Sequence, residues 1–443
     1  MAVASEEQAD VRPVDAVIRW VSIIGLFVTS LLVLATTEDS FRLPKELAAR
    51  SEAILLIVIV AVARLWNVRM QWTKLRWRDA AVLLPAAILI WTTLTTLTST
   101  NRVISVRALV WVATAAAVFI VIYASGRNRE LTALHALVGA AIANSVLAIL
   151  QETKIWNPIP AREAGLAPHL YTSGFIGNPD DLGGFLVVAA LVAMALVVVR
   201  RKGRVLMLLC LVVILGGLAA AQSMAAFLAT GAGLLVMSWM HSRKTFAASI
   251  TIVVAGAVIA TSLLPTVRMK VERVPTQVNE ILHGQAVLAL EGLSSNRVLP
   301  ALAAAHMFQH HPLKGVGPGC YGPRYFDATL CVQHRFPELR KSGVSYLHFA
   351  EAHNDHLQAL AVGGIPAYVL FLCAPLFLAW RTSRVQRNDE DERRRFARWC
   401  GAPLAASFLA LALFQFPLEL AAVTMALMYV VALVMQWSDD AAA

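Results

Sequence analysis

Two side chains in the C-terminal half of the sequence could do chemistry, His353 and Arg297. A neutral histidine, whose ordinary pKa is about 6.5, can accept a proton from a hydroxyl group at physiological pH. A guanidinium offers a fixed fork of N–H donors that matches phosphate oxygens. Each residue also has a simpler interpretation: a histidine bonded to backbone at a helix start, and a solvated arginine at a membrane surface.

Other polar residues could support such a site. Three further arginines have the same two interpretations as Arg297, namely Arg162, Arg268 and Arg324. Asn178 and Asn354 each precede an apolar run, so either could cap the following helix or contact a substrate. His353 and His356 have metal-ligand spacing, but no second pair or Glu-x-x-His motif accompanies them. We therefore expect neither a metal site nor a bound cofactor.

The composition indicates that lipid surrounds much of the chain. Of 443 residues, 58% are hydrophobic and 15% charged, against roughly 45–50% and about 25% in globular domains. The mean hydropathy is +0.64. A net charge of +10 would suggest nucleic acid as the partner of a soluble domain. In an integral membrane protein it reflects the placement of loops instead, and no nucleic-acid partner is expected.

Apolar runs of about 20 residues are long enough to cross a bilayer as helices. The first run has an acidic flank and is too long for a cleavable signal peptide, so it counts as a span. The sequence therefore predicts an all-α polytopic membrane protein with about 12 transmembrane helices, near 16–36, 46–66, 79–98, 103–124, 131–151, 182–199, 205–222, 224–241, 246–264, 357–380, 399–416 and 418–437.

Lys and Arg in the short loops predict the orientation. The loops after the even-numbered spans 2 to 10 carry 20 of them, and the short loops on the other side carry 7. Both termini are therefore expected in the cytoplasm, and the long late loop in the periplasm of a Gram-negative cell. This predicts three parts: spans 1–9 in 1–264, a periplasmic loop domain in 265–356, and spans 10–12 with the C-terminus in 357–443.

The long loop has its own local structure. Residues 296–311 have helical periodicity and predict a helix close to the membrane surface. Glycines and prolines crowd into 312–322 and predict a specific turn. Cys320 and Cys331 both fall in this loop, and because the compartment is oxidising we expect them to form a disulfide.

Three stretches together resemble the bacterial O-antigen ligases, within the superfamily that also holds O-antigen polymerases and protein O-oligosaccharyltransferases. They are Gly174–Asp180 (GFIGNPD), Asn296–Arg297 continuing through His311–Gly319 (HPLKGVGPG), and Ala352–Gln358 (AHNDHLQ) leading to Gly363–Ile365. Relatives often have a Ser-Arg pair where this chain has Ser223-Met224. The phosphate-binding role of that arginine cannot be carried over, which leaves Arg162, Arg268 and Arg324 as replacements.

The resemblance implies a metal-independent, inverting glycosyltransferase of the inner membrane. Its donor would be O-antigen linked to undecaprenyl diphosphate, and its acceptor a sugar hydroxyl of lipid A–core, with membrane lipids around both. His353 would be the general base, and arginines with Arg297 foremost would bind the diphosphate. The alternatives are an O-antigen polymerase, a protein O-oligosaccharyltransferase and, from another class, a 12-helix transporter. A transporter would favour two related halves, and the single large loop spoils such symmetry.

Overall fold

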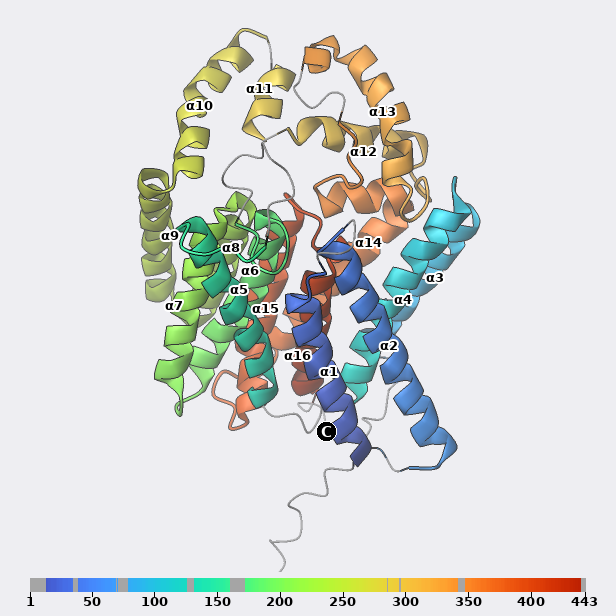
Figure 1. Cartoon of the computed structure of the whole chain (residues 1–443), viewed down its shortest axis with the longest axis vertical. Coiled ribbons are helices and arrows are strands. Elements are labelled where there is room, and N and C mark those ends of the chain that lie inside the picture. The colour runs from blue at the N-terminus through green and yellow to red at the C-terminus, as the bar shows by residue number, and fades with distance from the viewer. Residues whose placement is uncertain are drawn as a thin grey trace, which may run out of the picture.

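The computed structural model describes residues 13–34, 39–68, 70, 79–125, 131–159, 172–284, 286–294, 296–341 and 347–439. Over these residues the chain forms helices and turns and contains no β-strand. Figure 1 shows a bundle of long helices with further helices above one end. The all-α membrane fold predicted from composition and hydropathy is thus confirmed.

Each predicted apolar run lies in a helix of the bundle, although the ends differ by several residues. The helices are α1 (Pro13–Leu31), α2 (Arg42–Leu65), α3 (Ala80–Leu97), α4 (Arg102–Ser125), α5 (His135–Glu152), α6 (Pro179–Val199), α7 (Arg204–Ala221), α8 (Met224–His241), α9 (Arg243–Leu263), α14 (Asp355–Ser383), α15 (Glu392–Ala412) and α16 (Ala421–Asp439). Ten are long and apolar enough to cross a membrane. The other two, α2 and α15, begin with strongly charged turns.

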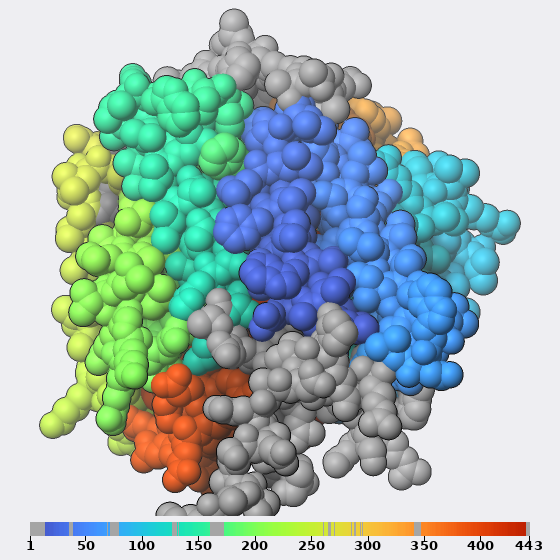
Figure 2. Space-filling view, turned by 60° about the horizontal axis from the view of Figure 1, so that its bottom comes forward, coloured from blue at the N-terminus to red at the C-terminus, as the bar shows by residue number. Residues whose placement is uncertain are grey.

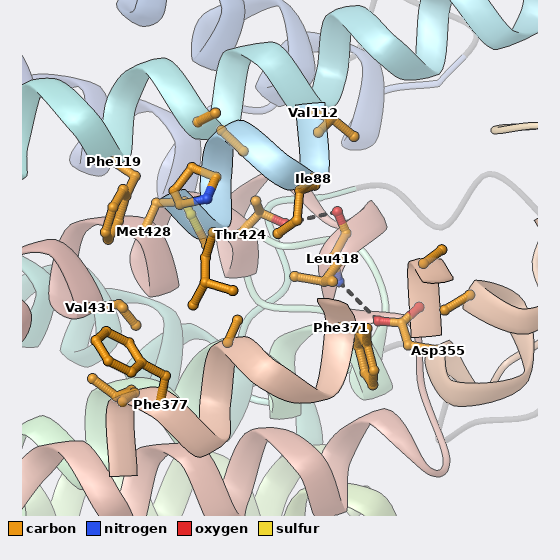
Figure 3. Close-up of a pocket in the computed structure, with 18 of the residues that line it drawn as sticks. Ile88, Val112, Phe119, Asp355, Phe371, Phe377, Leu418, Thr424, Met428 and Val431 are labelled. Carbon is orange, nitrogen blue, oxygen red and sulfur yellow. Dashed lines mark hydrogen bonds between the residues drawn. The ribbon is translucent and has the colours of Figure 1, made fainter. Parts of the chain in front are cut away.

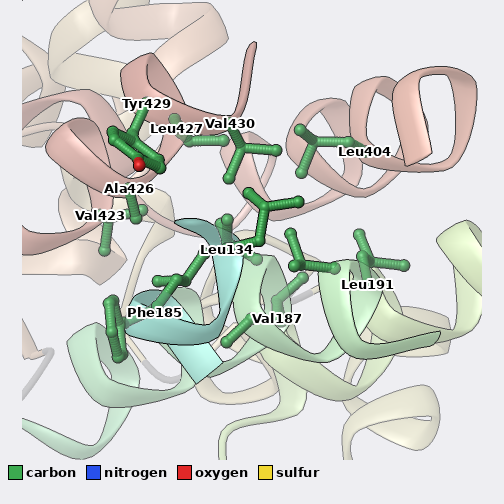
Figure 4. Close-up of a cluster of buried hydrophobic side chains, with 14 of the residues drawn as sticks. Leu134, Phe185, Val187, Leu191, Leu404, Val423, Ala426, Leu427, Tyr429 and Val430 are labelled. Carbon is green, nitrogen blue, oxygen red and sulfur yellow. The ribbon is translucent and has the colours of Figure 1, made fainter. Parts of the chain in front are cut away.

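The centre of the bundle is formed by α6 and α16, which are apolar on every face and almost fully buried. Figure 4 shows Phe185, Val187 and Leu191 of α6 close to Val423 and Val430 of α16. Several residues of α6 are glycine or alanine. Such small residues let neighbouring helices pack closely, and in lipid this packing, rather than the hydrophobic effect, holds helices together. On one outer face, α1 and α2 (blue) lie beside α5 (teal), with green and cyan segments on the flanks (Figure 2).

The long loop forms a layer over one end of the bundle, which we call the capped end (Figure 1). Its helices are α10 (Pro265–Leu282), α11 (Ala286–Leu293), α12 (Val298–His310) and α13 (Tyr321–Arg335), followed by the short 3-10 helix η4 (Pro337–Lys341). The predicted surface helix at 296–311 is therefore α12. Two further 3-10 helices, η2 (Leu131–Leu134) and η5 (Pro417–Glu419), precede α5 and α16.

The turn predicted at 312–322 connects this layer to α14. Gly315, Gly317 and Gly319 all have positive φ. The backbone N–H groups of Val316 and Gly317 donate to the carbonyls of Ala361 and Val362, at 2.9 and 3.1 Å. A side chain at Gly315 would collide with the backbone of Val362. The glycine is required here because two backbones meet at a residue with positive φ.

The predicted disulfide between Cys320 and Cys331 is wrong, because both residues are free cysteines. Cys320 precedes α13 and Cys331 lies within it. Eleven residues along a helix separate two Cα atoms by about 16 Å, far beyond the reach of a disulfide. The Cys320 sulfur instead lies 3.2 Å from the hydroxyl oxygen of Ser99.

Substitution of Gly315 should separate steric collision from backbone strain. Gly203 also has positive φ, but a side chain there would meet nothing within 4 Å. We expect Gly203→Ala to cost about 1–2 kcal/mol of unfolding free energy, from backbone conformation alone. Gly315→Ala should cost clearly more, because it adds the collision. Thermal unfolding midpoints in detergent micelles measure both variants, and equal losses would contradict this role of Gly315.

Candidate active site

A cavity of about 410 Å³ opens between the bundle and the helices above its capped end, and it contains both His353 and Arg297. One wall is apolar and comes from α8 and α10. The other wall is polar and comes from the start of α12, the segment before α14 and the end of α15. The lining residues are Met224, Ala225, Leu228, Val271, Val274, Ser294, Arg297, Val298, Ala301, Ala352, His353, Asn354, Leu413 and Phe414.

Arg297 is the residue directly before α12. The preceding Asn296 has a φ of 66°, a conformation that asparagine tolerates better than most residues. The carboxylate of Glu291 accepts from the backbone N–H groups of Val298 and Leu299, at 2.8 and 3.1 Å. These bonds satisfy free N–H groups at the helix start. They also fix the backbone next to Arg297 and thereby the point from which its side chain extends.

The guanidinium of Arg297 makes two bonds to the bundle. Its Nη2 forms an ion pair with Asp180 Oδ2 at 2.8 Å, and its Nη1 donates to the carbonyl of Phe414 at 2.6 Å. These bonds use two of the five N–H groups of a guanidinium. The side chain remains 24% exposed, so the other donors can reach a ligand in the cavity.

Asp180 is in turn held by the bundle. Its Oδ1 accepts a hydrogen bond of 2.6 Å from the hydroxyl of Ser223. The Ser223 oxygen accepts a bond of 3.2 Å from the side-chain amide of Gln415. Asn178 caps α6 by accepting from the backbone N–H of Asp180 at 2.8 Å. Asn178 thus has the capping role that the sequence allowed, and it positions Asp180.

His353 has a φ of 51°, in the left-handed region, where histidine is more frequent than most residues. Its ring meets Phe349 and Phe416 edge to face, with centroids 5.5 and 4.9 Å apart. Asn354 caps α14 by accepting from the Leu357 N–H at 3.0 Å, and its amide donates to the Leu413 carbonyl at 3.0 Å. The two aromatic rings and this cap orient the imidazole toward the cavity.

The surroundings of His353 favour the neutral imidazole. Burial lowers the pKa of His353 to about 4; the charges of Arg297 and Arg42 lower it too, and that of Asp180 opposes them. A lone pair on the imidazole is therefore available throughout the physiological pH range. Burial and the neighbouring arginines thus keep His353 neutral, and a neutral imidazole can accept a proton.

Sequence reasoning missed Arg42, which lies at the start of α2. Its Nη2 pairs with Asp181 Oδ2 at 3.2 Å, and its Nη1 lies 3.7 Å from Glu351 Oε1. The guanidinium carbon lies 5.2 Å from the centre of the Phe416 ring, whose edge-to-face partner is His353. No motif marks this arginine, because its partners come from distant parts of the chain.

Part of the chain is similar to a known family. Residues 209–372 match the family model described as O-antigen ligase. This range includes Arg297 and His353 and covers less than half of the chain, so Asp180 and Arg42 lie outside it. The match indicates a membrane glycosyltransferase of the O-antigen ligase and polymerase type. No curated protein matches the chain.

Two of the other predicted arginines, Arg268 and Arg324, do not line this cavity. Arg268 is exposed on α10 and pairs with Glu272 at 2.7 Å. Arg324 is exposed on α13 and pairs with Asp327 at 3.3 Å. Arg162 lies outside the described residues. Met224, where the sequence resemblance led us to look for an arginine, lines the cavity itself.

A second cavity, of about 350 Å³, lies in the bundle between α3, α4, α14 and α16 (Figure 3). Its lining is almost entirely apolar, and polar groups gather at the end formed by Asp355, Gln358 and Glu419. Gln358 donates to Glu419 at 3.2 Å, and the Leu418 N–H donates to Asp355 at 3.3 Å. The segment 352–358 therefore separates the two cavities, with His353 and Asn354 on one side and Asp355 and Gln358 on the other.

The pKa of His353 predicts the acid limb of the pH–rate profile. A general base acts when deprotonated, so kcat/KM should fall only as the pH approaches about 4, rather than near 6.5. Arg297→Gln removes a charge that lowers this pKa and should move the acid limb of the residual activity toward higher pH. The measurement is kcat/KM between pH 3.5 and 8 in detergent. An acid limb near 6.5 in the unmodified protein would contradict the assignment.

Proposed function

We propose that this protein transfers a finished glycan from undecaprenyl diphosphate to a sugar hydroxyl of lipid A–core, at the periplasmic face of the inner membrane. The observation that carries the proposal is that Arg297 and His353 line the same cavity. Arg297 offers a guanidinium with N–H donors left over for a ligand, and His353 offers a neutral imidazole. The first suits a phosphate and the second a hydroxyl group. Its place at the capped end of the bundle suits substrates that stay anchored in lipid.

Arg297 would stabilise the departing diphosphate. When the bond between the anomeric carbon and the phosphate oxygen breaks, negative charge grows on that oxygen. Arginine donors already fixed by Asp180 and Phe414 can neutralise it with little rearrangement. In this proposal the stabilisation comes from the protein's own cations, so the reaction needs no bound metal.

His353 would accept the proton of the acceptor hydroxyl as its oxygen attacks the anomeric carbon. Attack in line with the departing diphosphate inverts the configuration at that carbon. A diphosphate bound to Arg297 places negative charge near His353, and negative charge raises the pKa of a neighbouring imidazole. His353 would thus become a stronger base once the donor is bound.

The two cavities support a reaction between two lipid substrates. The cavity with Arg297 and His353 also has an apolar wall of Met224, Leu228, Val271 and Val274, which suits the first isoprene units of the donor. The second cavity has walls suited to an aliphatic chain, and it approaches the segment 352–358 from the opposite side. Both lipids could therefore remain in the membrane while their head groups meet.

Reconstituted transfer tests the proposal directly. Purified protein, undecaprenyl-diphosphate-linked glycan and lipid A–core are incubated with EDTA. Ladder-type lipopolysaccharide is the expected product. The anomeric carbon that is transferred should have the opposite configuration from that in the donor. Longer lipid-linked chains would mean that the protein is a polymerase. Activity that disappears with EDTA and returns with a divalent metal would overturn metal independence.

Variants of the two central residues test their roles. His353→Ala should lower kcat by about 10²–10⁴-fold, the usual contribution of general base catalysis. Arg297→Lys should also lose about 10²-fold or more, since lysine keeps the charge but not the fork of donors. His310→Ala and Arg268→Lys, which alter exposed residues away from the cavity, are the matched controls. Full activity in His353→Ala would exclude this residue as the base.

A further inference from the structure

Behind Arg297 lies a chain of polar side chains, of which Asp180 is partly exposed and the two behind it are buried. The amide of Gln415 donates to Ser223, the Ser223 hydroxyl donates to Asp180, and Asp180 accepts from Arg297. Ser223 and Gln415 are each only 3% exposed. Polar groups are rarely buried this deeply in a helix bundle unless their bonds fix something, because burial costs them their hydration.

The local sequence of α6 allows this chain to form. Gly183 lies one turn after Asp180, and a side chain there would come within 3.0 Å of the Ser223 Cβ and 2.8 Å of the Ala226 Cβ. Its absence lets the start of α8 approach α6 closely enough for Ser223 to reach Asp180. At the next residue, Gly184, a side chain would lie 3.2 Å from the side-chain oxygen of Gln415.

We propose that Asp180 is a positioning residue for Arg297, and that Ser223 and Gln415 fix the rotation of the Asp180 carboxylate. The two carboxylate oxygens divide the work: Oδ1 accepts from Ser223 and Oδ2 accepts from Arg297. The guanidinium plane is then set by Asp180 and by the Phe414 carbonyl together. This inference rests on the proposed role of Arg297 in binding the diphosphate.

A positioning role and a purely electrostatic role predict opposite effects on substrate binding. The negative charge of Asp180 weakens the attraction between Arg297 and an anionic donor. If charge alone mattered, Asp180→Asn would tighten donor binding and leave kcat unchanged. If position matters, the same variant should lower kcat. An asparagine has only one acceptor oxygen, so its NH2 group must face either Arg297 or Ser223 in place of a carboxylate oxygen, and the bond on that side is lost.

The test compares Asp180→Asn and Ser223→Ala with a matched control, Ser407→Ala. Ser407 is also fully buried between α8 and α15, where its hydroxyl donates to the Ala229 carbonyl at 2.6 Å, but it does not touch this chain of residues. We expect kcat to fall about 10–100-fold in Asp180→Asn, as for a displaced catalytic group, and about 3–10-fold in Ser223→Ala. Ser407→Ala should keep its kcat with a similar loss of thermal stability.

A second background separates failure of this inference from failure of the proposed function. In Arg297→Lys, the further effect of Ser223→Ala on kcat should nearly vanish, because the two residues act through one group. Binding of undecaprenyl diphosphate, measured by thermal shift, reports the donor site directly. If the unmodified protein neither binds this lipid nor transfers glycan, the proposed function fails. If it does both, and Asp180→Asn binds the lipid more tightly at unchanged kcat, only the positioning role is overturned.

Discussion

Four consecutive residues between α15 and η5 each hold a different part of the candidate active site. The Leu413 carbonyl accepts from Asn354 and the Phe414 carbonyl accepts from Arg297. The Gln415 carbonyl accepts from the Asp355 N–H at 3.2 Å, while its side chain bonds to Ser223. The Phe416 ring lies against His353 and Arg42. These carbonyls follow the last residue of α15 and lie outside regular helix, so they are free to accept hydrogen bonds from the residues of the site.

This arrangement depends on turns that place the functional residues outside regular helix. Three non-glycine residues with positive φ adjoin the site, namely Gln222 before Ser223, Asn296 before Arg297, and His353 itself. A residue other than glycine in this region costs of order 1–3 kcal/mol and persists only where the surrounding structure enforces it. Here the caps on α12 and α14, the turn at 413–416 and the α6–α8 contact supply that enforcement. These strained residues therefore adjoin the points where the chain turns and presents polar side chains to the cavity.

The helices of this fold could be predicted from the sequence, because a helix that crosses a bilayer needs a run of about 20 apolar residues that is easy to recognise. Apolar runs predicted the helices, and asparagines before such runs predicted the caps on α6 and α14. Residue type and the surrounding motif selected His353 and Arg297, and both line the same cavity. What could not be predicted is pairing across the bundle: Asp180 and Arg297 are 117 residues apart. Arg42 escaped notice for the same reason, and the disulfide failed because a helix separates the two cysteines.

The pairing also explains how two arginines can be stable beside apolar walls when no ligand is bound. A bare guanidinium that is half buried beside apolar walls would pay a large desolvation cost, and a carboxylate at hydrogen-bond distance offsets much of it. Asp180 serves Arg297 in this way, and Asp181 with Glu351 serves Arg42. Successive residues of α6 thus hold two arginines from distant parts of the chain, Arg42 and Arg297. An anionic ligand bound at Arg297 would meet donors whose positions are already fixed, so less of its binding free energy would be lost in ordering them.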